Sequence, residues 1–134
     1  MKLVSIQIET PLGDRVRVGA VDAGGQYVDL EYALRGQLIA DGLTDAAAER
    51  IATALIPSSM VAFIEGGDRS LDAARGALAW AEGQQDFSGR WAPESVQLLA
   101  PVPSPPTLRD FMAFETHLTN IFPKLGREIP PAWY

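Results

Sequence analysis

The only histidine of the chain, His117, follows an aspartate, Asp110, at a spacing that suits joint action on one ligand. The two residues are seven positions apart, which on an α-helix is about two turns, so their side chains would share one face. A rise of about 1.5 Å per residue separates them by roughly 10 Å, so they would not touch. Both could still reach a small molecule along that face, where an imidazole can exchange a proton near neutral pH. We therefore treat a helix over residues 107–117 as a candidate site.

Both residues also have ordinary structural explanations. Thr107 followed three positions later by Asp110 resembles a capping box, and an acid near a helix N-terminus is favoured by the helix dipole. A single histidine on a helix face is more often a surface or core residue than a catalyst. Composition and spacing leave these alternatives open.

The composition restricts the class of protein. The 134 residues are 47% hydrophobic and 21% charged, which is typical of one folded domain with a real core. A net charge of −6 argues against nucleic acid and anionic membranes as partners. The lack of cysteine excludes disulfides and thiolate catalysis. We see no signal peptide and no apolar run of roughly 20 residues, so we expect a cytoplasmic protein.

Residues 1–30 alternate between apolar and polar side chains with the period of β-strands. Turn-forming residues at 10–14 and 23–26, including Gly13 and the pair Gly24-Gly25, separate the alternating segments. The expected strands cover residues 2–9, 15–22 and 27–30. They predict a small antiparallel β-meander.

The apolar spacing then becomes helical. Helices are expected over residues 31–40, 45–55 and 71–82, with a short apolar turn or helix at 60–64. Thr44 and Ser70 are the predicted N-caps of the second and third helices. Ala46, Ile51 and Leu55 are predicted to face the core from the second helix.

An irregular loop over 86–93, held to the core by Phe87 and Trp91, and a short apolar strand over 96–100 complete the first part of the chain. The proline-rich segment 101–106 then separates residues 1–100 from residues 107–134. The fold class is therefore α+β: an antiparallel meander, helices, a proline-rich hinge and a terminal helical arm.

The order of residues after 96 resembles the fumarylacetoacetate hydrolase family. The strongest likeness is the string Arg-Asp-Phe-Met-Ala-Phe-Glu-Thr-His at 109–117, after Val-Gln-Leu-Leu-Ala-Pro-Val-Pro at 96–103 and before Pro-Pro-Ala-Trp-Tyr at 130–134. Looser likenesses lie in the first strands, at residues 1–5, 16–22 and 28–30. The resemblance covers the amino-terminal portion of the family, including the junction with its catalytic domain.

The resemblance implies a metal-dependent enzyme that acts on diketo or oxo acids. Asp110 corresponds to the first carboxylate ligand of Mg²⁺, or of Ca²⁺ or Mn²⁺, and His117 to the general base that activates water. The metal would act as a Lewis acid on an enolisable carbonyl, and carbon–carbon hydrolysis would yield two acids. Relatives decarboxylate, hydrate or isomerise similar oxo acids. Met112 replaces a substrate-facing tyrosine of some relatives, so no substrate contact is assigned there.

The family's other metal ligands are a Glu-x-Glu pair and a later aspartate in a β-rich domain, and Glu128 is the only acid after His117 here. We therefore expect residues 107–134 to be a truncated start of the catalytic domain, and the isolated chain to be inactive. The alternatives are a non-catalytic interaction or regulatory module, or a subunit completed by a separate catalytic half.

The arm is rich in apolar residues that would lack a partner without the catalytic domain. We expect it to be mobile or to associate with another chain, most simply in a homodimer. The residues in question are Phe111, Phe114, Ile121, Phe122, Trp133 and Tyr134.

Overall fold

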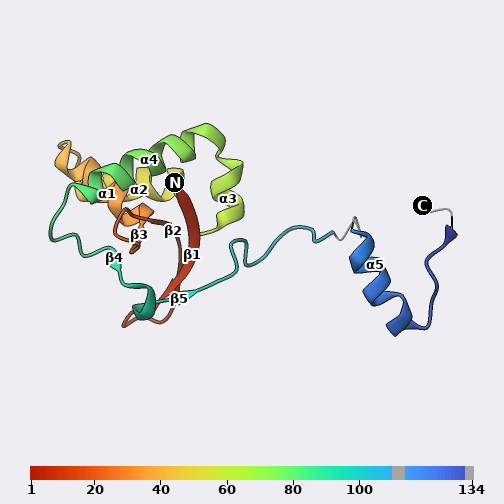
Figure 1. Ribbon diagram of the computed structural model, residues 1–134. Coiled ribbons are helices and arrows are strands. Elements are labelled where there is room, and N and C mark those ends of the chain that lie inside the picture. The colour runs from red at the N-terminus through yellow and green to blue at the C-terminus, as the bar shows by residue number, and fades with distance from the viewer. Residues whose placement is uncertain (110–113, 132–134) are drawn as a thin grey trace.

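A computed structural model describes residues 1–109 and 114–131, and these residues form an α+β fold (Figure 1). One antiparallel sheet has the strand order β4-β3-β2-β1-β5. Its strands are β1 (Lys2–Ile8), β2 (Arg15–Val21), β3 (Tyr27–Asp29), β4 (Arg90–Trp91) and β5 (Gln97–Leu98). The predicted fold class is confirmed, and the predicted meander is its central part, β1-β2-β3.

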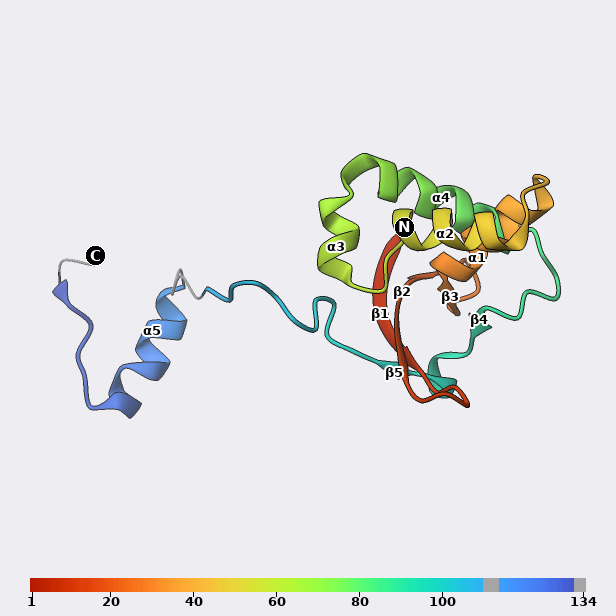
Figure 2. The same ribbon diagram turned by 180° about the vertical axis from the view of Figure 1, so that it is seen from behind.

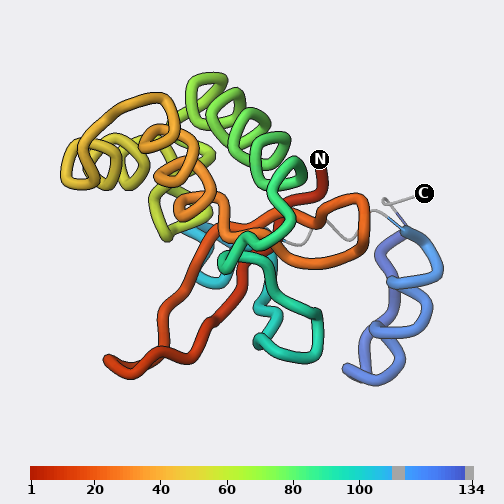
Figure 3. The backbone as a smooth tube through the Cα atoms, turned by 90° about the vertical axis from the view of Figure 1, so that its left-hand side faces the viewer, coloured from red at the N-terminus to blue at the C-terminus, as the bar shows by residue number. Residues whose placement is uncertain are grey.

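The β1–β2 pairing follows from the alternating pattern of the sequence. Lys2 is opposite Val21 and Ile8 is opposite Arg15, a register that puts Ile6 and Val18 in the core. Gly13 closes the connecting turn with a φ of +100°, which a side chain would disfavour. The hairpin tip projects away from the helices (Figure 3).

The two outer strands correct two expectations about the segment before the hinge. Residues 90 and 91, predicted to lie in an irregular loop, form β4 and pair with β3. The apolar strand predicted over 96–100 shortens to Gln97–Leu98, and Leu98 is half exposed at the outer edge. A turn of 3₁₀-helix, η1 (Pro93–Ser95), lies between them. Such short edge strands carry little sequence periodicity, which explains both errors.

Four helices pack together beside the sheet (Figures 1 and 2). They are α1 (Leu30–Ala40), α2 (Asp45–Leu55), α3 (Met60–Glu65) and α4 (Gly67–Glu82). All four expected helical segments are present, and the helix predicted to start at Leu71 begins at Gly67. Ser70 is not its N-cap but lies buried within α4, because the Gly66-Gly67 pair joins α3 directly to α4. Gly67 makes this possible with a φ of +58°.

The buried side chains of α2 and α4 are all small. The buried residues of α2 are Ala48 and Ala52, whereas Ile51 is 39% exposed and Ala46 is also exposed, so the predicted inward face is wrong for both. Leu55 is partly buried against the core. Alanine lets helices approach closely, and α4 contributes its own row of Ala74, Ala77 and Ala81. The prediction is therefore correct for Leu55 and wrong for Ala46 and Ile51.

The folded body extends to Val102. Ser5 Oγ donates a hydrogen bond to the carbonyl oxygen of Pro101 over 2.8 Å, and Val102 packs against the core. The chain then leads to the terminal helix α5 (Glu115–Ile121) and a 3₁₀ turn, η2 (Pro123–Leu125). Figures 1 and 2 show α5 well separated from the sheet and α1–α4. Within the described ranges, no helix is long and apolar enough to cross a membrane.

Candidate functional site

His117 lies in the first turn of α5, where its side chain is exposed. Phe114, immediately before this helix, is extended, with φ −111° and ψ 123°, and residues 107–109 have no regular secondary structure. The helix predicted to carry Asp110 and His117 on one face is therefore wrong in its described part. A short helix outside the core lacks the tertiary packing that stabilises most helices. Asp110 itself lies outside the described residues.

The described residues do not make up a magnesium site. Residues 1–109 and 114–131 contain no group of three or more histidine, aspartate or glutamate side chains that could hold a metal. Mg²⁺ prefers several oxygen ligands in near-octahedral geometry, and the arm offers only Glu115 and Glu128 among its described carboxylates. The donor set does not fit the metal by itself, so we derive no reaction step through a metal.

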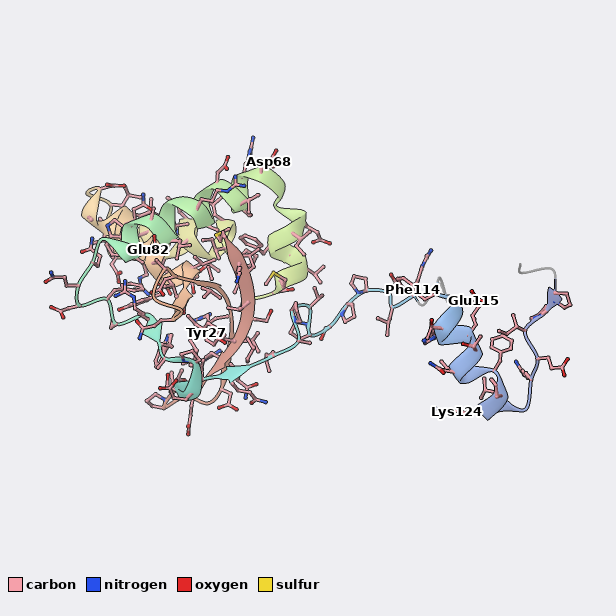
Figure 4. All side chains as sticks on the ribbon, in the orientation of Figure 1. Tyr27, Asp68, Glu82, Phe114, Glu115 and Lys124 are labelled. Carbon is pink, nitrogen blue, oxygen red and sulfur yellow. The ribbon has the colours of Figure 1, made fainter. Side chains whose placement is uncertain are left out.

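Part of the arm is exposed, and Figure 4 shows its labelled residues Phe114 and Glu115, at the start of α5, and Lys124, in η2, away from the folded body. Phe114 is 77% exposed and Leu108 is 92% exposed. Ile121 and Phe122 are half-buried within the arm itself. Of the residues predicted to form an exposed patch, Phe114 is therefore exposed, whereas Ile121 and Phe122 are only partly exposed. Phe111, Trp133 and Tyr134 lie outside the described residues.

The folded body contains a cleft of about 340 Å³ that sequence reasoning missed. It lies between the β1–β2 connection, the start of α1 and the segment leading into β4. Its lining residues are Ile8, Glu9, Thr10, Pro11, Arg15, Arg17, Asp29, Tyr32, Ser88, Gly89 and Trp91. The cleft therefore combines an apolar wall with several charged groups, as ligand sites commonly do.

A buried carboxylate, Asp29, connects the sheet to α1 at one side of this cleft. The residue is 6% exposed, and its Oδ1 accepts a hydrogen bond from the Tyr32 backbone N–H over 3.1 Å, which caps α1. Its Oδ2 lies 3.3 Å from Nε of Arg17, whose Nη1 lies 3.4 Å from Oε2 of Glu31. Arg17 thus lies between two carboxylates on neighbouring elements.

Burial makes Asp29 an unusual acid. Loss of water around the carboxylate raises its pKa to about 6, and nearby Glu31 adds to this shift. The Tyr32 N–H and the Arg17 guanidinium oppose the shift without cancelling it. Asp29 therefore begins to take up a proton in the mildly acidic range.

Part of the cleft could have been predicted from the sequence. Arg15 and Arg17 alternate on one strand and so lie on the same face, and Asp29 precedes a helical pattern directly. The side contributed by Ser88, Gly89 and Trp91 comes from a segment predicted to be irregular. Because long-range contacts such as the β3–β4 pairing bring that segment to the cleft, the sequence alone did not indicate the site.

Comparisons of the chain with family models, curated proteins and solved structures find no match. The resemblance to fumarylacetoacetate hydrolases therefore rests on the sequence strings at 96–103, 109–117 and 130–134 and on the looser likeness of the first strands.

Proposed function

We propose that this chain is the amino-terminal part of a metal-dependent enzyme of the fumarylacetoacetate hydrolase family that acts on diketo or oxo acids. The order of residues over 96–117 carries the proposal, from Val-Gln-Leu-Leu-Ala-Pro through the prolines to the string that ends at His117. In this proposal, residues 1–100 are the accessory domain and residues 107–134 begin the catalytic domain. The remaining metal ligands come from a domain outside these 134 residues.

Two features of the arm support this assignment. His117 is exposed on α5, at the surface of the arm that would face another domain in this proposal. The neighbouring Phe114 is also exposed, as expected of a residue that packs against a catalytic domain. We propose His117 as general base and Asp110 as the first metal ligand, and a cytoplasmic location for the whole enzyme.

The test is to assemble the chain with the domain encoded after it, or with a neighbouring gene product, that carries Glu-x-Glu and a later aspartate. Cleavage of an acylpyruvate should require both parts and Mg²⁺. His117→Ala should lower kcat by about a hundredfold or more, a typical contribution of a general base. Thr119→Ala, an exposed position on the same helix, should leave kcat unchanged. A His117→Ala enzyme with the full rate would refute the base assignment.

The exposure of Leu108 and Phe114 also supports a second function, that of a non-catalytic interaction module. The coding sequence downstream of Tyr134 distinguishes the two functions. If neither the downstream frame nor a neighbouring gene encodes Glu-x-Glu and a later aspartate, the interaction module is the better account.

A further inference from the structure

The cleft beside Asp29 contains charged groups that its internal ion pairs do not use. Arg17 is paired with Asp29 inside the cleft and with Glu31 nearby. Arg15 and Glu9 also line the cleft, and among the described residues neither makes an ion pair. One cation and one anion therefore remain available to a ligand.

The charge balance selects the class of ligand. The lining contains two arginines, Arg15 and Arg17, and two acids, Glu9 and Asp29, so its formal charge is zero. A purely anionic ligand would meet Glu9, and a purely cationic one would meet Arg15. A ligand with one charge of each sign would satisfy both groups, with charge-assisted hydrogen bonds at each end.

The rest of the lining suits an apolar body. Trp91, Tyr32, Pro11 and Ile8 present mainly carbon, and the Ser88 hydroxyl donates a 3.3 Å hydrogen bond to the Tyr32 hydroxyl. The volume of about 340 Å³ falls at the small end of ligand pockets, for which about 300–1,000 Å³ is usual. This size fits a metabolite of amino-acid dimensions rather than a nucleotide or a protein segment.

We propose that this cleft binds a zwitterionic α-amino acid with an apolar side chain. The carboxylate pairs with Arg15, the ammonium group pairs with Glu9, and the side chain lies against Trp91 and Tyr32. The Asp29–Arg17 ion pair also lines the cleft, and its two charges are already paired with each other. The site belongs to the folded body and is independent of the function proposed for His117.

Titration of the 134-residue protein with L-phenylalanine, followed by amide and indole N–H chemical shifts, tests the proposal. We expect saturable shifts at Gly89 and at the Trp91 indole, with a dissociation constant on the order of 1 mM, as ligand-efficiency limits suggest for such a small molecule. Phenylacetate lacks the ammonium group and 2-phenylethylamine lacks the carboxylate. Each should bind about tenfold more weakly, because each leaves one charged group of the cleft unpaired.

Single-charge variants locate the two ends of the ligand. Arg15→Gln and Glu9→Gln should each weaken L-phenylalanine binding about tenfold. Arg50→Gln, at an exposed position of α2, is the matched control and should bind as the wild type does. Both cleft positions are exposed, and Glu9→Gln supplies the test if Arg15→Gln does not fold. Absence of saturable shifts, equal binding of phenylacetate, or equal weakening by Arg50→Gln would overturn the proposal.

Discussion

Ser5 and Pro101 are joined across the sheet edge by a hydrogen bond of 2.8 Å from the Ser5 hydroxyl to the Pro101 carbonyl oxygen. Ser5 is 1% exposed, and its own carbonyl accepts the Leu99 N–H over 2.9 Å. One residue of β1 therefore holds the chain at two points just before it leaves the body. These two bonds tie residues 99 and 101 to β1 just before the arm begins.

Ser5→Ala should make residues 99–106 more mobile without unfolding the folded body. The Pro101 carbonyl would lose its partner, at a cost of about 1 kcal/mol in the free energy of unfolding. Amide exchange at Leu99 and proteolytic cleavage within 99–106 should both become faster. Ser104→Ala, an exposed serine of the same segment, is the control and should change neither. Loss of stability with unchanged exchange at Leu99 would contradict the anchoring role of Ser5.

Two helical glycines should respond to alanine in opposite directions. A Cβ on Gly36 of α1 would lie 2.6 Å from Cη2 of Trp80, whereas a Cβ on Gly76 of α4 would have its nearest neighbour at 3.7 Å. Gly76→Ala should stabilise the protein by up to about 1 kcal/mol through helix propensity. Gly36→Ala should destabilise it by roughly 1–3 kcal/mol because Trp80 must move. Urea unfolding of both variants measures the difference, and equal effects would refute the close α1–α4 contact.

Asp29 should make the protein less stable as pH rises through the mildly acidic range. Its pKa is about 6 when folded and 3.8 in its ordinary state, so the folded protein binds more protons between these values. The favourable contribution is complete below about pH 4 and is lost as pH rises through 6. Between pH 4.5 and 7.5 the loss is roughly 2 kcal/mol.

Asp29→Asn should remove this contribution while keeping a side chain that can cap α1. The change in unfolding free energy between pH 4.5 and 7.5 should differ from that of the wild type by roughly 2 kcal/mol. Asp86→Asn, at an exposed position, should keep the wild-type profile. Denaturant unfolding at several pH values provides the measurement. A wild-type profile in Asp29→Asn would mean that Asp29 does not titrate there.

The sequence predicted the elements with strong local patterns and missed those created by tertiary contacts. The alternation over β1–β3 and the helical spacing of α1 and α2 are local, and both were found. β4 exists because Trp91 pairs opposite Tyr27, which lies far away in the sequence. The cleft beside Asp29 is lined by Trp91 and therefore also depends on this long-range pairing. A helix was expected from residue 107, but α5 begins at Glu115. Helical spacing in the sequence does not stabilise a helix that lacks tertiary packing.

The exposed arm should cause association that depends on Leu108 and Phe114. They are 92% and 77% exposed, and burial of one such side chain contributes roughly 1.5–3 kcal/mol, or about tenfold or more in affinity. Leu108→Ser and Phe114→Ser should each weaken self-association by that factor in sedimentation velocity over a concentration series.

Leu12→Ser is the matched control, because Leu12 is 86% exposed at the tip of the β1–β2 turn and belongs to the body rather than the arm. Its sedimentation should match that of the wild type. A wild-type monomer at every concentration, or equal weakening by Leu12→Ser, would show that the arm is not the interface. Weakening by the two arm variants alone would identify residues 107–134 as the contact between copies, because the control removes a leucine of similar exposure from the body.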